Sequence, residues 1–181
     1  MTVAAGVARA GRLLVVSHCI LNPLTVVRGL QSNREASRTL LEWALSHDVA
    51  LAQMPCPEFC YAGAERGPRT REGYEVPDFE ALCRELGAGV VRLVRQHVEA
   101  GHRVLGIVGV EGSPSCGVAL TTRGTADGEK KVAEPGIYTV ELVRALAAAG
   151  LTVPYIGLPR RAAYEGPSDW LRVLDGLLPE E

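Results

Sequence analysis

The chain has 181 residues, of which 47% are hydrophobic and 22% are charged, and its formal net charge is −2. These values are typical of a soluble globular protein and predict one domain over residues 1–181. The near-neutral charge does not provide the basic surface that binding of a nucleic-acid polymer requires. We find no secretory signal and no apolar run of about 20 residues, so we expect a cytoplasmic protein that does not interact with membranes.

The five cysteines need an explanation other than disulfide bonds. A chain of this length buries roughly 70% of its unfolded surface when it folds, so its core holds together without cross-links. In a reducing cytosol, such cysteines bind metals, act in catalysis or are buried in the core.

Continuous apolar runs alternate with amphipathic stretches along the chain, which is typical of parallel βαβ units. The predicted strands are 13–16, 49–54, 103–110 and 152–156. The predicted helices are 33–47, 77–101 with a break near Gly87 and Gly89, 137–149 closed by Gly150, and 168–178 capped by Ser168. With right-handed crossovers, this order predicts an α/β three-layer sandwich around a mainly parallel, Rossmann-like sheet of about four to five strands.

Two long segments between these elements lack periodicity. Residues 56–76 are rich in Gly, Pro, Arg and Glu, and residues 112–134 form a turn followed by a polar stretch. Because connections of this length are commonly functional, we interpret 56–76 as an active-site loop.

Three cysteines directly follow three of the predicted strands: Cys19 after the first, Cys56 after the second and Cys116 after the third. The carboxyl ends of parallel strands share one edge of the sheet, so we expect the three thiols to converge there. Gly112 and Gly117 would allow the backbone to approach an inorganic centre closely.

Three thiolates suit either an iron–sulfur cluster or zinc. A structural zinc site usually shows paired ligands, and here only Cys56 and Cys60 are close in sequence. Single cysteines on three separate loops are more typical of a four-iron cluster with one iron left open. Zinc remains the alternative.

Four motifs occur in this order: Ser17-His18-Cys19, Cys56-Pro57-Glu58, Pro68-Arg69 and Ser113-Pro114-Ser115-Cys116-Gly117. Together they resemble the 2-thiouracil desulfurase family. The resemblance implies a [4Fe-4S] cluster bound by Cys19, Cys56 and Cys116, whose open iron takes sulfur from a thiolated substrate. It also implies Glu58 and Ser113 as candidate catalytic groups.

Other polar residues near the predicted edge have weaker assignments. Arg66 and Arg69 either lie on a solvated loop or bind an anionic group of the substrate, and Ser115 is a further candidate for substrate contact. Cys83 falls on an apolar helical stripe and is expected to be buried. Cys60 is interpreted as a core thiol, with a spare ligand or a sulfur acceptor as alternatives.

We therefore expect an enzyme that removes sulfur from a thio-nucleobase or a thioamide. Its expected partners are this small thiolated molecule and, as an arrangement to be tested, a second copy in a homodimer. The alternatives are a cluster-dependent dehydratase and a zinc-binding or ligand-binding module without catalysis.

Overall fold

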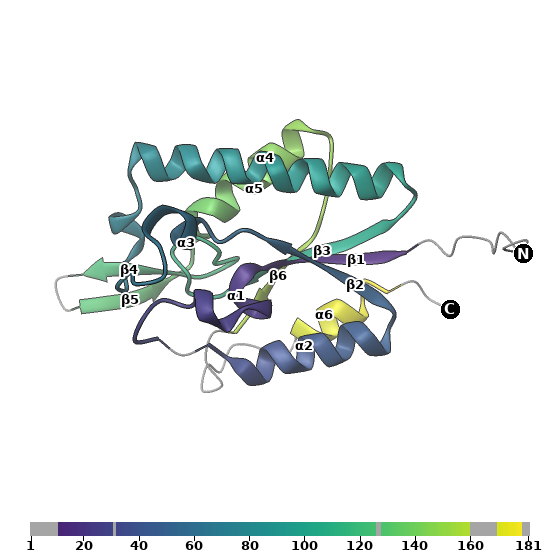
Figure 1. The fold of residues 1–181 in the computed structure, drawn as a ribbon, viewed down its shortest axis with the longest axis horizontal. Coiled ribbons are helices and arrows are strands. Elements are labelled where there is room, and N and C mark those ends of the chain that lie inside the picture. The colour runs from purple at the N-terminus through teal and green to yellow at the C-terminus, as the bar shows by residue number, and fades with distance from the viewer. Residues whose placement is uncertain (1–10, 31, 126–127, 160–169, 179–181) are drawn as a thin grey trace, which may run out of the picture.

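The computed structural model describes residues 11–30, 32–125, 128–159 and 170–178. A four-stranded parallel sheet in the order β2-β1-β3-β6 lies at its centre. The strands are β1 (Arg12–Ser17), β2 (Val49–Met54), β3 (Arg103–Val110) and β6 (Tyr155–Leu158). Helices cover both faces of this sheet (Figure 1), so the predicted α/β sandwich with a Rossmann-like parallel sheet is confirmed.

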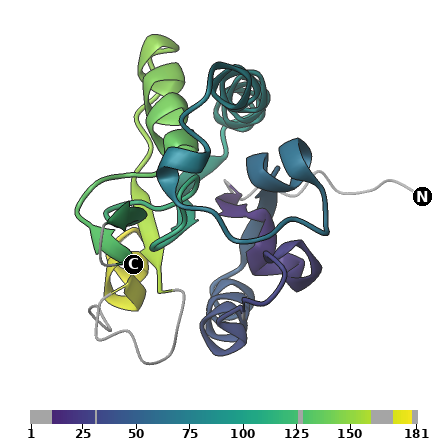
Figure 2. The same ribbon diagram turned by 90° about the vertical axis from the view of Figure 1, so that its left-hand side faces the viewer.

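Helices α4 (Pro77–Glu99) and α5 (Ile137–Ala148) lie on one face, and α2 (Arg34–Ser46) and α6 (Trp170–Asp175) lie on the other (Figure 2). A separate hydrophobic core fills each interface between helices and sheet. Residues 13–16 of β1 contribute side chains to both cores and are completely or almost completely buried. This double burial explains why the strand has no polar alternation.

The long helix α4 is continuous through Gly87 and Gly89, so the predicted break is wrong. A Cβ at Gly87 would lie 3.9 Å from Leu142 and 4.0 Å from Tyr138, both on α5. Gly87 therefore allows α4 and α5 to pack closely without interrupting the helix.

The last strand begins three residues later than predicted and ends two residues later, over Tyr155–Leu158 instead of 152–156. Proline has no backbone N–H and cannot donate to a strand ladder. Pro154 instead accepts a hydrogen bond from the N–H of Ile107, and strand pairing begins at Tyr155.

Both segments expected to be irregular contain regular structure. Residues 56–76 include helix α3 (Pro57–Ala62) and the 3₁₀ turn η2 (Arg71–Gly73), and the polar stretch forms a hairpin of β4 (Thr121–Thr125) and β5 (Gly128–Val132). Two short elements follow β1, namely α1 (His18–Leu21) and η1 (Pro23–Thr25).

The predicted cap Ser168 lies outside the described residues. No helix in the described part of the chain is long and apolar enough to cross a membrane.

Candidate active site

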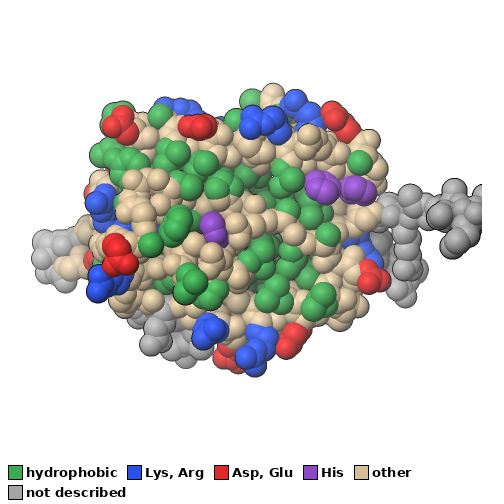
Figure 3. All heavy atoms as spheres, in the orientation of Figure 1, with side chains coloured by type: hydrophobic (Ala, Val, Ile, Leu, Met, Phe, Trp, Pro, Cys, Tyr) green, Lys and Arg blue, Asp and Glu red, His purple; other side chains and the backbone are tan. Residues whose placement is uncertain are grey.

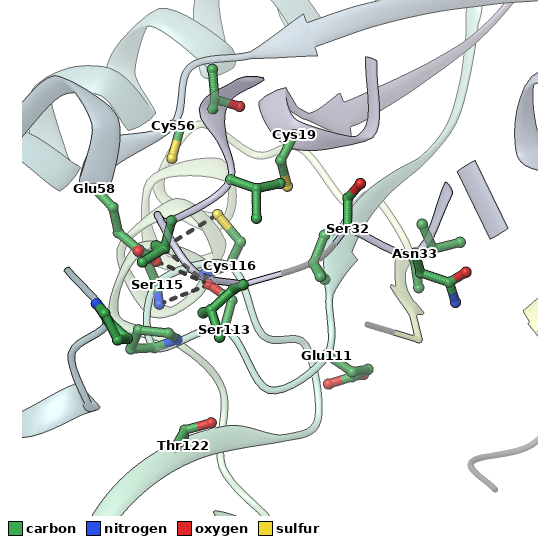
Figure 4. Close-up of a pocket in the computed structure, with 18 of the residues that line it drawn as sticks. Cys19, Ser32, Asn33, Cys56, Glu58, Glu111, Ser113, Ser115, Cys116 and Thr122 are labelled. Atoms are coloured by element: carbon green, nitrogen blue, oxygen red, sulfur yellow. Dashed lines mark hydrogen bonds between the residues drawn. The ribbon is translucent and has the colours of Figure 1, made fainter. Parts of the chain in front are cut away.

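The carboxyl ends of β1, β2 and β3 lead directly into the three segments that carry Cys19, Cys56 and Cys116. All three cysteines line one cavity of about 460 Å³. Their sulfur atoms point into a common space (Figure 4). The cavity is in the size range of small-molecule sites.

Cys19 is positioned by the end of β1. Ser17 is buried, and its hydroxyl donates a 3.0 Å hydrogen bond to the carbonyl of Val108 on β3. The chain then turns into α1, so His18 does not follow strand alternation. Its ring faces Phe59 at a centroid distance of 6.0 Å, and burial lowers its pKa.

Cys56 is the N-cap of α3. Its Sγ accepts a hydrogen bond of 3.4 Å from the N–H of Phe59, and Pro57 occupies the first helical position, which proline favours. Burial, followed by the nearby charge of Glu58, raises the pKa of the Cys56 thiol to about 12. The thiol is therefore protonated at neutral pH, and a bound metal would have to displace this proton.

Cys116 is held in a tight turn by Ser113. The Ser113 hydroxyl accepts hydrogen bonds from the N–H groups of Ser115 (3.3 Å) and Cys116 (3.0 Å). The start of α5 lies against the same turn, and a Cβ at Gly136 would lie only 2.3 Å from the carbonyl oxygen of Ser115. Burial raises the pKa of the Cys116 thiol.

Two glycines of this turn are also needed by the fold of the turn itself. Gly112 has a φ of +79°, which favours glycine, and a Cβ at Gly117 would lie 2.1 Å from the carbonyl oxygen of Leu120. Both glycines are required by the protein's own backbone.

Glu58 joins α3 to the turn that contains Cys116. Its Oε1 accepts hydrogen bonds from Ser115 (2.6 Å) and Ser113 (3.2 Å), and its Oε2 accepts a longer one of 3.5 Å from the hydroxyl of Tyr74. The Nε atom of Arg66 lies 3.8 Å from Oε2. Although Glu58 is buried, its carboxylate is therefore surrounded by donors.

The two candidate substrate-binding arginines differ in burial. Arg66 is buried and donates to the carbonyls of Thr25 (2.6 Å) and Gly63 (2.9 Å), and its Nη2 lies 3.8 Å from the Sγ of Cys56. Arg69 lines the cavity with its guanidinium 5.5 Å from the ring centroid of Tyr74. Both arginines line the cavity, but the Arg66 guanidinium is held by backbone carbonyls, whereas Arg69 lies beside an aromatic ring.

The remaining cysteines lie elsewhere. Cys83 is completely buried in the core beneath α4, as predicted. Cys60 is exposed on α3, so its interpretation as a core thiol is wrong.

The β4–β5 hairpin contributes cavity residues that the sequence did not indicate, namely Thr122, Glu129, Lys130 and Lys131. Lys131 donates to the carbonyl of Gly112 (3.2 Å) and to the hydroxyl of Thr122 (2.9 Å). The hairpin has little apolar alternation because β5 is mostly exposed, and so it gave no strand signal.

Arg123 attaches this hairpin to the loop that precedes α4. Its guanidinium pairs with Glu72 at 3.0 Å, with Glu75 at 3.0 Å and with Glu134. The N–H of Gly124 also donates to Glu72 at 3.1 Å.

Within the described residues, no group of three or more His, Cys, Asp or Glu side chains is arranged to hold a metal ion. Thiolates on tetrahedral zinc, with Zn–S bonds of about 2.3 Å, lie only about 3.8 Å apart. A four-iron cluster accepts sulfurs that are spread more widely, over roughly 7 Å. Three thiols around one cavity are soft donors of the kind that both zinc and iron–sulfur clusters take.

The family model described as "Putative 2-thiouracil desulfurase" matches residues 11–140, which include all the site residues above. The chain belongs to this family. A curated relative of this chain is "Uncharacterized protein MJ0003" from Methanocaldococcus jannaschii. The two are 30% identical over 107 residues, which cover 59% of this chain and 68% of the relative. No solved structure matches the chain.

Proposed function

We propose that this protein is a desulfurase that removes sulfur from a thiolated small molecule, with Cys19, Cys56 and Cys116 as ligands of a [4Fe-4S] cluster. The observation that carries the proposal is that these three thiols, from three different strand ends, line one cavity together with Glu58 and Ser113. Membership of the desulfurase family supports the type of reaction.

When bound, such a cluster supplies an open iron that acts as a Lewis acid and accepts a soft sulfur atom. The chain supplies the three thiolates and a cavity partly closed to water. The soft donor set favours iron–sulfur chemistry over a hard cation such as Mg²⁺.

Glu58 and Ser113 are the candidate groups for proton transfer. The Ser113 hydroxyl is 3.2 Å from the Oε1 of Glu58, so a proton can pass between them, and both residues line the cavity. Replacing a thiocarbonyl sulfur with oxygen requires water to attack the carbon, and a carboxylate within reach can accept the proton of that water.

Ser115, Arg66 and Arg69 all line the cavity, but they have different neighbours. Ser115 and Arg66 lie 2.6 Å and 3.8 Å from carboxylate oxygens of Glu58 and can orient it, whereas Arg69 lies beside the ring of Tyr74. We assign to Arg69 the contact with a carbonyl or anionic group of the substrate.

The cluster is tested by anaerobic purification and reconstitution, with iron, zinc and sulfide measured for each variant. Cys19→Ala, Cys56→Ala and Cys116→Ala should each lose the iron and sulfide, while Cys60→Ala and Cys83→Ala serve as matched controls that retain them. Equal iron content in all five variants, or a protein that binds only zinc, would contradict the proposal.

The reaction is tested by sulfide release from 2-thiouracil, other thio-nucleobases and small thioamides. We expect Glu58→Gln and Ser113→Ala to retain the cluster and to lose about 100-fold or more in rate. A fully loaded wild-type protein that releases no sulfide from any of these compounds would exclude desulfuration of them and favour the dehydratase alternative.

A further inference from the structure

Among the described strands, β2 forms an edge of the sheet and pairs with β1 alone. Its sequence, Val-Ala-Leu-Ala-Gln-Met, contains no charged residue and no proline. Exposed edges are normally protected by lysine, proline or bulges, because an unprotected edge pairs readily with another strand. Ala50 and Gln53 of this strand are exposed.

The surface around this edge is apolar. Figure 3 shows hydrophobic side chains across the middle of this face, over β2 and between α4 and α2, with most charged side chains around the margin. A shallow groove runs between β2 and α4 and is lined by Gln53, Leu86, Gly89 and Leu93 among others. Leu86 and Leu93 are only partly buried.

Gly89 is located in the middle of α4, and its packing against the described residues does not require a glycine. A Cβ at this position would meet only the guanidinium of Arg92, at an ordinary distance of 3.8 Å. Glycine destabilises the interior of a helix. Unlike Gly87, which packs against α5, Gly89 leaves room on the outer side of the helix, where another backbone can approach.

Two opposite charges flank Gly89 along the groove. Glu85 lies four residues before it and Arg92 three residues after it, and both are exposed. Among the described residues, neither has an ion-pair partner, since the pairs formed along α4 involve Arg84 with Glu80. A surface with this pattern is complementary to itself, because a two-fold rotation about Gly89 places each Glu85 opposite the Arg92 of the other copy.

We propose that this face binds a second copy of the chain and forms a two-fold symmetric dimer. The two β2 strands pair antiparallel across the axis, so the two sheets become one continuous sheet. The two α4 helices lie side by side and antiparallel over it, and they approach most closely at Gly89. Leu86 and Leu93 bury their exposed parts, and two Glu85–Arg92 pairs close the rim. This inference does not depend on the reaction proposed for the cavity that contains the three cysteines.

The test is the molar mass of the full chain in solution, measured by light scattering and sedimentation over a range of micromolar concentrations. We expect a dimer for the wild type. Gly89→Lys should give a folded monomer, because lysine has the higher helix propensity and a Cβ at this position lies no closer than 3.8 Å to the described atoms of its own chain. Preserved helical circular dichroism would show that this variant is folded.

Charge reversal gives the sharper experiment. Glu85→Arg and Arg92→Glu each place like charges opposite one another and should weaken the dimer about tenfold or more. The double variant E85R/R92E restores complementarity and should recover dimerisation, whereas Arg95→Glu, an exposed charge reversal outside the groove, should leave it unchanged. A monomeric wild type, a dimer insensitive to all these changes, or a groove that binds only a different protein would overturn the proposal.

Discussion

Ser115 donates a 2.6 Å hydrogen bond to the Oε1 of Glu58, and both residues are buried. Glu58 belongs to the segment after β2 that contains Cys56, and Ser115 belongs to the segment after β3 that contains Cys116. One short bond therefore connects two of the three cysteine-bearing segments. The relative position of two proposed cluster ligands depends on it.

Replacement of Ser115 by alanine tests the contribution of this bond. The buried Glu58 carboxylate would lose its closest donor, so we expect the free energy of unfolding to fall by about 1–3 kcal/mol. The measurement is urea denaturation at neutral pH. Ser46→Ala is the control, because Ser46 is an exposed serine whose hydroxyl bonds groups close to it in sequence, the carbonyl of Trp43 and the ring of His47, and it should change stability by less than about 0.5 kcal/mol. Equal losses of unfolding free energy in the two variants would show that the hydrogen bond of Ser115 stabilises the fold no more than that of Ser46.

Arg66 and Glu58 should be energetically coupled. Removing one member of a buried, oppositely charged pair costs about 3–5 kcal/mol, because the other charge stays buried. We expect Arg66→Met and Glu58→Gln each to lower the free energy of unfolding. The double variant should lose less than the sum of the two single losses, by at least about 1 kcal/mol.

A double-mutant cycle on Arg28 and Glu65 is the matched control. These two residues form an ion pair at 2.7 Å, but their side chains are 75% and 82% exposed. Solvent screens such pairs, so we expect a coupling energy near zero. A coupling between Arg66 and Glu58 as small as that of the exposed pair would contradict their proposed interaction.

The parallel sheet could be predicted from the sequence because each strand and helix shows its burial in a local pattern of apolar residues. The run Leu13–Val16 is buried on both faces, and the apolar stripes of α2, α4 and α5 show directly which side of each helix is buried. The β4–β5 hairpin was missed because most of β5 is exposed and carries charged residues. Its position is set by Arg123, whose partners Glu72 and Glu75 are about fifty residues away in sequence.

For the candidate site, too, the sequence predicts what depends on topology but misses contacts between distant segments. Parallel topology was enough to predict that the segments of Cys19, Cys56 and Cys116 share an edge. The contact of Ser115 with Glu58 and the burial of Arg66 depend on how two loops fold against one another. Neither loop has a local sequence pattern that indicates this packing. Cys60 was misjudged because α3 is too short to show which of its sides faces solvent.

Gly136→Ala should disturb the turn that holds Cys116. The added Cβ would lie 2.3 Å from the carbonyl oxygen of Ser115, and neither backbone can move without displacing the other. We expect a destabilisation of about 1–3 kcal/mol, together with reduced iron incorporation on reconstitution. Gly67→Ala is the control, because a Cβ there meets nothing within 4 Å, and it should be neutral or slightly stabilising. Normal stability and iron content in Gly136→Ala would contradict the close contact.

The cluster of Arg123 with three glutamates should make stability depend on acid pH. In the folded protein, the pKa of Glu72 is lowered from 4.5 to about 2 by hydrogen bonds from backbone N–H groups, including that of Gly124, and from Thr70 and Arg123. Hydrogen bonds with Arg123 also lower the pKa values of Glu75 and Glu134. Because these pKa values are lower in the folded than in the unfolded chain, the glutamates stabilise the fold above pH 4.5, and this contribution disappears as the pH falls toward 2.

Arg123→Gln removes part of the pKa shift, so we expect its acid unfolding to begin at a higher pH than that of the wild type. The difference between the two proteins should shrink in high salt. Acid titrations followed by circular dichroism measure both effects, with Arg144→Gln, whose partner Glu141 lies on the same helix, as the control. If the acid transitions of the wild type and Arg123→Gln coincide, these ion pairs do not stabilise the attachment of the hairpin.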